Sequence, residues 1–284
     1  MAGMGSRDIK RKIKSVNSTM QITKAMKLVS TAKLKKNRDR FDLTKPYFDT
    51  VLKTVRDIVS SNKNLKHDFL EEREKRKTLY IVITSDRGLC GGYNVNALKK
   101  ALATLESKEK SSFITIGKKA HDYLANRGYE IVEHYLGISE QPEYLDAQKI
   151  AGLALRQFMQ EEADEIKLVY TRLISTVVQE AACLKLLPIE ADDQDSQPLE
   201  FVSYEPSPEE VLSYLIPKFL EAVVYGALVE SAAAEQAARR IAMENATDNA
   251  QEMIDELTLS FNQARQGAIT QEISEIVSGA EALK

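Results

Sequence analysis

The feature that most constrains the fold is the C-terminal stretch of residues 208–284, which contains little that would stop a helix. Its glycines are Gly226, Gly267 and Gly279, and Pro217 is its proline beyond the first turns. Ala, Leu, Glu, Gln and Met, which favour helices, predominate. A continuous helix of this length would reach roughly 110 Å at about 1.5 Å per residue. Much of it must therefore project from the globular part and find a partner.

The apolar side chains of this stretch recur at spacings of three and four residues. They are Met243, Ala246, Ala250, Met253, Leu257, Phe261, Ala264 and Ala268. Such a narrow seam is typical of a coiled coil rather than of a helix lying on a core. Small side chains in residues 231–238 would let a second helix approach closely. The alternative is a long surface helix of a bundle.

The first segment, residues 6–62, is also helical in character, and Pro46 is its one strong breaker. We expect Pro46 to kink or interrupt the helix, because proline removes a backbone donor and clashes with the preceding turn. One apolar stripe follows the segment. It consists of Ile9, Ile13, Val16, Met20, Ile22, Met26 and Val29. A second long helix therefore precedes the middle of the chain.

The two ends of the chain carry opposite charge, although the net charge is only −3. Residues 1–58 hold 15 Lys and Arg against 5 Asp and Glu, whereas residues 209–284 hold 5 against 13. We expect the basic and the acidic helix to pair with each other. The alternative is that the two ends serve different partners, the basic helix lying on nucleic acid or on an anionic membrane surface.

The middle of the chain alternates strand-like and helical segments. Residues 78–84, 111–117 and 129–135 are predicted strands with helices between them. After a further helix, residues 166–174 and 177–187 are separated by a short turn and predict a hairpin. This alternation indicates a small Rossmann-like α/β domain with a parallel sheet.

The order of these segments predicts the domain organisation. A long helix enters the compact domain and another leaves it, so the two can pair only if they are antiparallel. The predicted fold class is α/β, with a long antiparallel two-helix coiled coil and the α/β domain at one end. The predicted boundaries are 1–62 for the N-terminal helix, 63–76 for a charged connector, 77–205 for the α/β domain and 206–284 for the C-terminal helix.

A glycine-rich turn between a strand and a helix is the one place that suggests a nucleotide site. It matches neither of the two common phosphate-binding motifs. We therefore interpret Gly88, Gly91 and Gly92 as a structural turn. No nucleophile–base or paired-carboxylate arrangement stands out, so we expect no catalytic residue. The alternative is an enzyme that uses this turn, and it predicts saturable nucleotide binding by the isolated chain.

The remaining composition narrows the possibilities. Two cysteines, Cys90 and Cys183, make no disulfide framework and fit a reducing compartment. Arg87 beside Cys90 would lower the pKa of the thiol, but a small residue filling a tight turn is the favoured interpretation. Three scattered histidines lack metal-ligand spacing, so we expect neither a metal nor a cofactor. We expect no membrane-spanning segment and no secretion signal.

Three separated stretches, in order along the whole chain, carry a resemblance to a known family. They lie at residues 13–29, 85–94 and 235–280. They include IKSVNSTMQITKAMKLV in the first, SDRGLCGGYN in the second, and EQAAR, AMENATDN and ARQGAITQE in the third. In these motifs the chain resembles the gamma subunit of the F-type ATP synthase. The lack of an organelle-targeting presequence favours a bacterial member.

The resemblance implies a rotor. In that family the coiled coil is the central shaft inside a ring of alternating alpha and beta subunits. The α/β domain lies against the epsilon subunit and the membrane c-ring, and catalysis belongs to the beta subunits. The expected location is the cytoplasmic side of the plasma membrane, as a peripheral protein with no nucleic-acid partner. Rotation of an asymmetric shaft would bias the beta subunits in turn by differential contact.

The resemblance also implies particular contacts with the beta subunits. The matching positions are Arg265, Gln266, Thr270, Glu272, Met26 and Arg239. For each of them the alternative is ordinary coiled-coil packing or a solvated charge. Residues 276–284 would lie in an apolar sleeve of the ring. Arg240 stands where many relatives have Met, and the 188–208 loop lacks the cysteine pair of chloroplast members.

Overall fold

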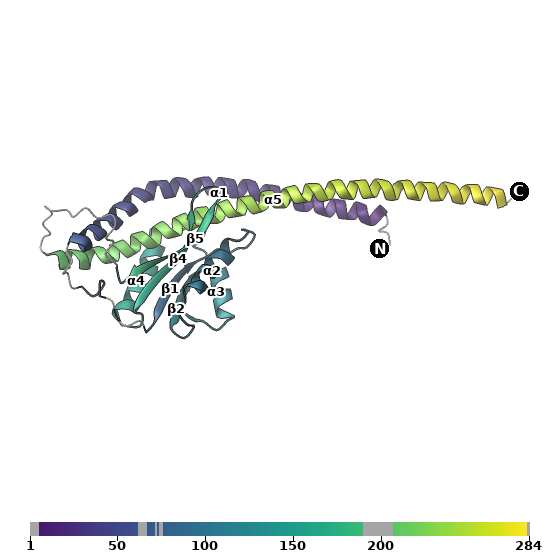
Figure 1. Ribbon diagram of the computed structural model, residues 1–284. Helices are drawn as coiled ribbons and strands as arrows, with labels where there is room; N and C mark the ends of the chain where they lie inside the picture. Colours follow the sequence, from purple (N-terminus) through teal and green to yellow (C-terminus); the bar gives the residue numbers. More distant parts are fainter. Residues whose placement is uncertain (1–5, 62–66, 72, 74–75, 190–206, 283–284) are drawn as a thin grey trace. The chain divides into compact units, whose positions relative to one another are not determined.

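The computed structural model of the chain describes residues 6–61, 67–71, 73, 76–189 and 207–282 (Figure 1). Its elements, in chain order, are α1 (Ser6–Ser61), β1 (Thr78–Ile83), α2 (Tyr93–Ala103), β2 (Ser111–Ile116), α3 (Lys118–Ala125), β3 (Glu130–Tyr135), α4 (Tyr144–Met159), β4 (Glu165–Leu173), β5 (Gln179–Leu187) and α5 (Pro208–Ala282).

Parts of two predicted segments, the charged connector at 63–76 and the loop at 188–208, lie outside the described residues. The chain forms two compact units. The globular unit comprises residues 30–239, and the helical unit comprises residues 1–29 and 240–284. The two long helices, α1 and α5, each contribute one part to each unit.

The globular unit is built on a five-stranded sheet in the order β3-β2-β1-β4-β5. Neighbouring strands are parallel except for β5, which runs antiparallel to β4 as the second arm of a hairpin. Helices α2 and α3 cover one face, and α4, α5 and part of α1 cover the other. This is the strand order of a doubly wound sheet with an added hairpin. The Rossmann-like α/β prediction is confirmed.

β1 shows how the sequence specifies the two layers. All six of its residues are buried, as expected of a central strand with helices on both faces. Successive side chains of a strand point to opposite faces. Leu79, Ile81 and Ile83 accordingly join the core under α4 and α5, whereas Tyr80 and Val82 join the core under α2 and α3.

Within the globular unit α5 is a core helix rather than an amphipathic surface helix. It is buried on several sides because it packs on the sheet and against α1. Its apolar content is high enough that an 18-residue window, of mean hydropathy 1.4, passes the length and composition test for a membrane span. Because 56% of that window is buried inside the protein, the window has the character of a core helix.

In the helical unit the N-terminal part of α1 pairs with the C-terminal part of α5. The Thr23 and Thr247 hydroxyls lie 2.8 Å apart, and Lys27 Nζ donates to Glu244 Oε1 at 2.7 Å. A higher number on α1 thus faces a lower number on α5, so the helices are antiparallel. The predicted pair of long antiparallel helices is confirmed, and α1 continues through Pro46 without a break.

The seam between these helices differs in part from the predicted one. Ile22 and Val29 are 60% and 55% exposed, and Thr23 is buried in the seam instead. On α5, Met253 is 44% exposed and Ile254 is the partly buried residue. Ala268 was also expected in the seam and is exposed. At Thr23 the small side chain suits the seam, because its hydroxyl lies 2.8 Å from that of Thr247 on the facing helix.

Candidate functional site

The glycine turn between β1 and α2 (residues 85–94) lies at the carboxyl end of the central strand. Gly91 has a φ of +55°, in the left-handed region that glycine adopts without a steric penalty. Gly92 has a φ of −81°, and an added Cβ on Gly88 would meet only Lys119 at ordinary contact distance. The turn conformation therefore requires glycine at Gly91 in particular.

The carboxylate of Asp86 fills the same edge of the sheet. Its Oδ1 accepts a hydrogen bond from the Lys118 N–H at 3.1 Å. Its Oδ2 accepts from the Gly137 N–H at 3.0 Å and from Ser139 Oγ at 2.9 Å. Ligands of open parallel sheets bind outside the carboxyl ends of the strands. Here the chain's own donors surround the carboxylate at that edge, which ties together the loops after β1, β2 and β3.

A buried ion pair on α5 holds the glycine turn. Arg239 Nη1 lies 2.7 Å from Glu235 Oε1, and the two side chains are 7% and 1% exposed. Arg239 Nη2 donates to the backbone carbonyls of Arg87 and Gly88, each at 3.4 Å. Four residues along a helix place Glu235 and Arg239 on one face. We call this arrangement the arginine clamp, because it fastens the turn to α5.

The carboxylate of the arginine clamp is electrostatically unusual. Burial raises the pKa of Glu235 to about 7, and the attraction of Arg239 opposes this rise only in part. Neither carboxylate oxygen accepts a well-aligned hydrogen bond within the described residues. A buried charge without such bonds is held by its partner alone, so removing that partner typically costs about 3–5 kcal/mol.

Cys90 and its neighbours pack beneath the clamp. Cys90, Tyr93 and Ala234 form a small buried cluster. Burial raises the pKa of the Cys90 thiol, so the possible lowering by the nearby arginine is not realised. Asn94 Oδ1 accepts from the Ser85 N–H at 2.9 Å, and its Nδ2 donates to Cys90 Sγ at 3.1 Å. The thiol is a packing group of the turn, as the favoured interpretation of the sequence had it.

The C-terminal extension (residues 265–282) is a single helix whose side chains are exposed from residue 265 to residue 279. The partly buried positions of α5 end at Ala264, while α1 begins at Ser6. The register of the antiparallel pair places these two residues roughly opposite each other. The extension therefore lies beyond the helix that would cover it.

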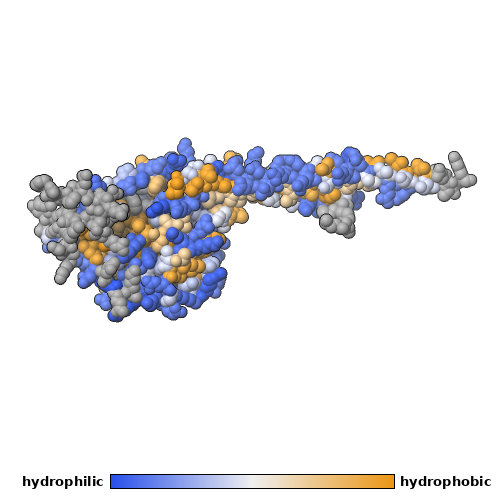
Figure 2. All heavy atoms as spheres, in the orientation of Figure 1, coloured by the Kyte–Doolittle hydropathy of each residue, from blue (hydrophilic) through white to orange (hydrophobic). Residues whose placement is uncertain are grey.

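The extension carries both predicted contact residues and apolar ones. The predicted contact residues Arg265, Gln266, Thr270 and Glu272 are all exposed there. Exposed apolar side chains also recur along this end of α5, where Figure 2 shows hydrophobic surface; they are Ile269, Ile273, Ile276 and Val277.

The structure places the other two predicted contact residues differently. Met26 is partly buried in the helical unit, one residue from the Lys27–Glu244 ion pair. Arg239 is buried and belongs to the arginine clamp. The predicted pairing between the basic and the acidic helix is found at Lys27, which forms an ion pair with Glu244. Two other lysines of the basic helix, Lys14 and Lys24, are exposed. The structure thus gathers four of the six predicted residues on one exposed helix.

Comparison with known proteins identifies the family. Residues 5–283 match the sequence profile of the ATP synthase family. The ATP synthase gamma chain of Alkaliphilus metalliredigens is 54% identical over 288 residues, which cover 99% of this chain and 100% of that protein. The chain belongs to the ATP synthase gamma-chain family. Another family member, the sodium-ion-specific gamma chain of Acetobacterium woodii, is 47% identical over 97% of this chain and 98% of its own length.

Chains of two solved ATP synthase structures share the architecture. A chain of the Euglena gracilis mitochondrial ATP synthase, from a structure of the OSCP, F1 and c-ring, has a TM-score of 0.74 and 23% identity. That match covers 98% of this chain and 94% of the other. A chain of the Euglena gracilis rotor structure has a TM-score of 0.70 over 93% of this chain and 98% of its own. These two structures support the fold, and the sequence matches above confirm the resemblance found in the motifs.

Sequence reasoning missed two residues that organise the site. Glu235 falls within a family motif but was assigned no role, and Asp86 was not singled out. The available signal for Glu235 is its spacing of four residues from Arg239 in an alanine-rich segment, which indicates a pair facing a close neighbour. Asp86 has no comparable signal, because its three donors come from loops far apart in the sequence.

Proposed function

We propose that the chain is the central rotor shaft of an F-type ATP synthase and is not itself catalytic. By rotating, it couples ion flow through a membrane c-ring to ATP synthesis and hydrolysis on the beta subunits. The observation that carries this proposal is membership of the gamma-chain family along the whole chain. The exposed extension of α5 supports it, because a helix with exposed apolar residues and no partner among the described residues of its own chain is suited to an external ring.

The arrangement of the predicted contact residues supports two kinds of role. Exposure of Arg265, Gln266, Thr270 and Glu272 favours direct contact with the beta subunits. Burial of Arg239 favours an indirect role, in which it keeps the glycine turn on the rotating helix. The occupied edge of the sheet, with Asp86 already bonded to three donors, supports a non-catalytic subunit.

The proposed partners are the alpha and beta subunits around the shaft, the epsilon subunit and the c-ring. The proposed location is the cytoplasmic face of a bacterial plasma membrane, where the chain is peripheral and held through the complex. Nucleic acid is not among the proposed partners. The opposite charge of the two ends fits this proposal, because Lys27 of the basic helix binds Glu244 of the acidic one.

Co-purification tests the proposal. The full chain is expressed with alpha and beta subunits of the closely related Alkaliphilus complex, and ATP hydrolysis of the isolated assembly is measured. Removing residues 265–284 should lower turnover of the assembly, whereas the matched control that removes only residues 283–284 should leave it unchanged. A chain that stays alone, or that hydrolyses ATP by itself, would contradict the proposal.

A further inference from the structure

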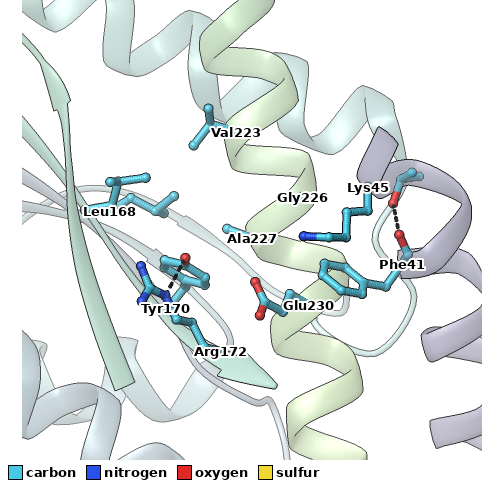
Figure 3. A pocket seen from close by; sticks show the side chains of 11 residues that line it. Phe41, Lys45, Leu168, Tyr170, Arg172, Val223, Gly226, Ala227 and Glu230 are labelled. Atoms are coloured by element: carbon cyan, nitrogen blue, oxygen red, sulfur yellow. Dashed lines mark hydrogen bonds between the residues drawn. The ribbon is translucent and has the colours of Figure 1, made fainter. Parts of the chain in front are cut away.

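A cavity of about 210 Å³ lies within the globular unit where α1, α5 and the β4–β5 hairpin meet (Figure 3). Apolar side chains of the sheet and of α5 line its inner part, among them Leu168, Leu184 and Val223. The next residues of α5 that face it, Gly226 and Ala227, are small. The cavity exists because α5 presents almost no side-chain volume at the level where α1 passes.

Charged side chains from three different elements surround this apolar interior. Lys45 reaches in from α1, Arg172 from β4 and Glu230 from α5 (Figure 3). Among the described residues, neither cation comes within ion-pair distance of Glu230. Glu230 Oε1 instead accepts from the Leu173 N–H at 3.0 Å, and Arg172 Nε donates to the Tyr170 hydroxyl at 3.2 Å. Lys45 and Arg172 therefore face Glu230 across an open space, and each has a further carboxylate near it, Asp49 beside Lys45 and Glu180 opposite Arg172 on β5.

The existing partners of the two cations leave them available to a ligand. Lys45 Nζ lies 3.5 Å from Asp49 Oδ2, and both side chains are more than half exposed. Exposed pairs of this kind contribute little free energy. Arg172 uses its Nε for Tyr170, so its two terminal amino groups can still donate to a second acceptor in paired geometry. Burial also raises the pKa of Glu230.

We propose that this cavity binds a small monocarboxylate with an apolar body, such as an aromatic or branched aliphatic acid. The carboxylate would lie between Lys45 and Arg172, and the body would lie against Leu168, Leu184 and Val223. An apolar cavity of about 150 Å³ is known to hold a benzene ring. The additional volume here suits one attached head group. This site does not depend on the proposed rotor function.

The test compares three probes that share one ring and differ in the charge of the head group. Benzoate, benzyl alcohol and benzylamine are titrated into the full chain, and amide NMR shifts of Gly226 and Ala227 are followed. We expect benzoate to bind with a dissociation constant at least tenfold lower than that of either other probe. Equal or tighter binding of benzylamine would overturn the proposal, as would the absence of shifts with all three at millimolar concentration.

Two substitutions and a matched control locate the head group. Lys45→Gln and Arg172→Gln should each weaken benzoate binding about tenfold, since each removes a charge-assisted contact. Arg38→Gln is the control, because Arg38 forms a similar exposed pair with Asp42 on the same helix outside the cavity. Thermal melting confirms that each variant folds. Unchanged benzoate affinity in both substituted chains, or an equal loss in the control, would refute the proposed site.

Discussion

Replacing the carboxylate of the arginine clamp should change how the stability of the chain depends on pH. Glu235 has a pKa of about 7 in the folded chain against 4.5 for the unperturbed group, because burial disfavours its charged form. The folded state therefore holds this proton more tightly than the unfolded state. Its contribution to stability is fully present below pH 4.5 and declines as the pH rises toward 7.

The size of the effect follows from the two pKa values. Between pH 5 and pH 8 the group should lower the free energy of unfolding by about 2–3 kcal/mol. Glu235→Gln keeps the shape and cannot ionise, so the stability of the variant relative to the parent should rise by that amount over the same range. Urea unfolding of the full chain at several pH values, followed by circular dichroism, measures it.

The matched control is Glu252→Gln, which neutralises an exposed carboxylate on the same helix. Its stability relative to the parent should be nearly independent of pH. If the stability difference between Glu235→Gln and the parent is also independent of pH, the buried carboxylate does not hold its proton as inferred. The electrostatic account of the clamp would then be wrong.

Three further predictions test the packing. Gly117→Ala should cost at least about 3 kcal/mol in urea unfolding, because a Cβ would lie 2.2 Å from a backbone oxygen at a φ of +85°; Gly137→Ala, at a φ of +80° with open space, should cost about 1–2 kcal/mol. Ile9→Ala should lower the free energy of unfolding by about 2 kcal/mol or more, because Ile9 is buried in the seam. Ile22→Ala should change it by no more than about 0.5 kcal/mol, because Ile22 is exposed. Equal losses would contradict the observed seam. Cys90 should react with iodoacetamide far more slowly in the folded chain than in urea, as mass spectrometry would show.

The alternation of strands and helices was predictable because it follows from the pattern of apolar and polar residues within short segments. Thr78–Ile83 is a continuous apolar run, and the structure buries it on both faces. The hairpin followed from two strand-like segments with a short turn between them, and β4 and β5 pair antiparallel. The long helices followed from composition and from the scarcity of breakers. Each of these inferences needs only neighbouring residues.

The register of the long helices was less predictable. Hydropathy favours Ile22 over Thr23 in a seam, yet the structure buries Thr23, whose hydroxyl meets that of Thr247. Where two helices approach closely, only small side chains fit between them. A single sequence does not indicate at which positions the helices approach closely. Met253 was likewise expected in the seam, whereas Ile254 is the less exposed residue.

The candidate site was predictable only where its residues are close together in the sequence. Four predicted contact residues share one exposed helix because they are neighbours in the sequence. The burial of Arg239 depends instead on the carbonyls of Arg87 and Gly88, about 150 residues earlier in the chain. The cavity beside Gly226 likewise requires four elements, α1, β4, β5 and α5, to meet. Such contacts depend on the tertiary fold, and the local periodicity of the sequence does not predict them.

The most direct test of the rotor proposal is observation of rotation in a single assembled complex. The ring of alpha and beta subunits is fixed to a surface, and a bead is attached to this chain through Glu109→Cys on an exposed loop of the globular unit. On addition of ATP, we predict that the bead turns continuously in one direction relative to the ring. A bead that stays in place while the same complexes hydrolyse ATP would contradict the proposal that this chain is the rotating shaft.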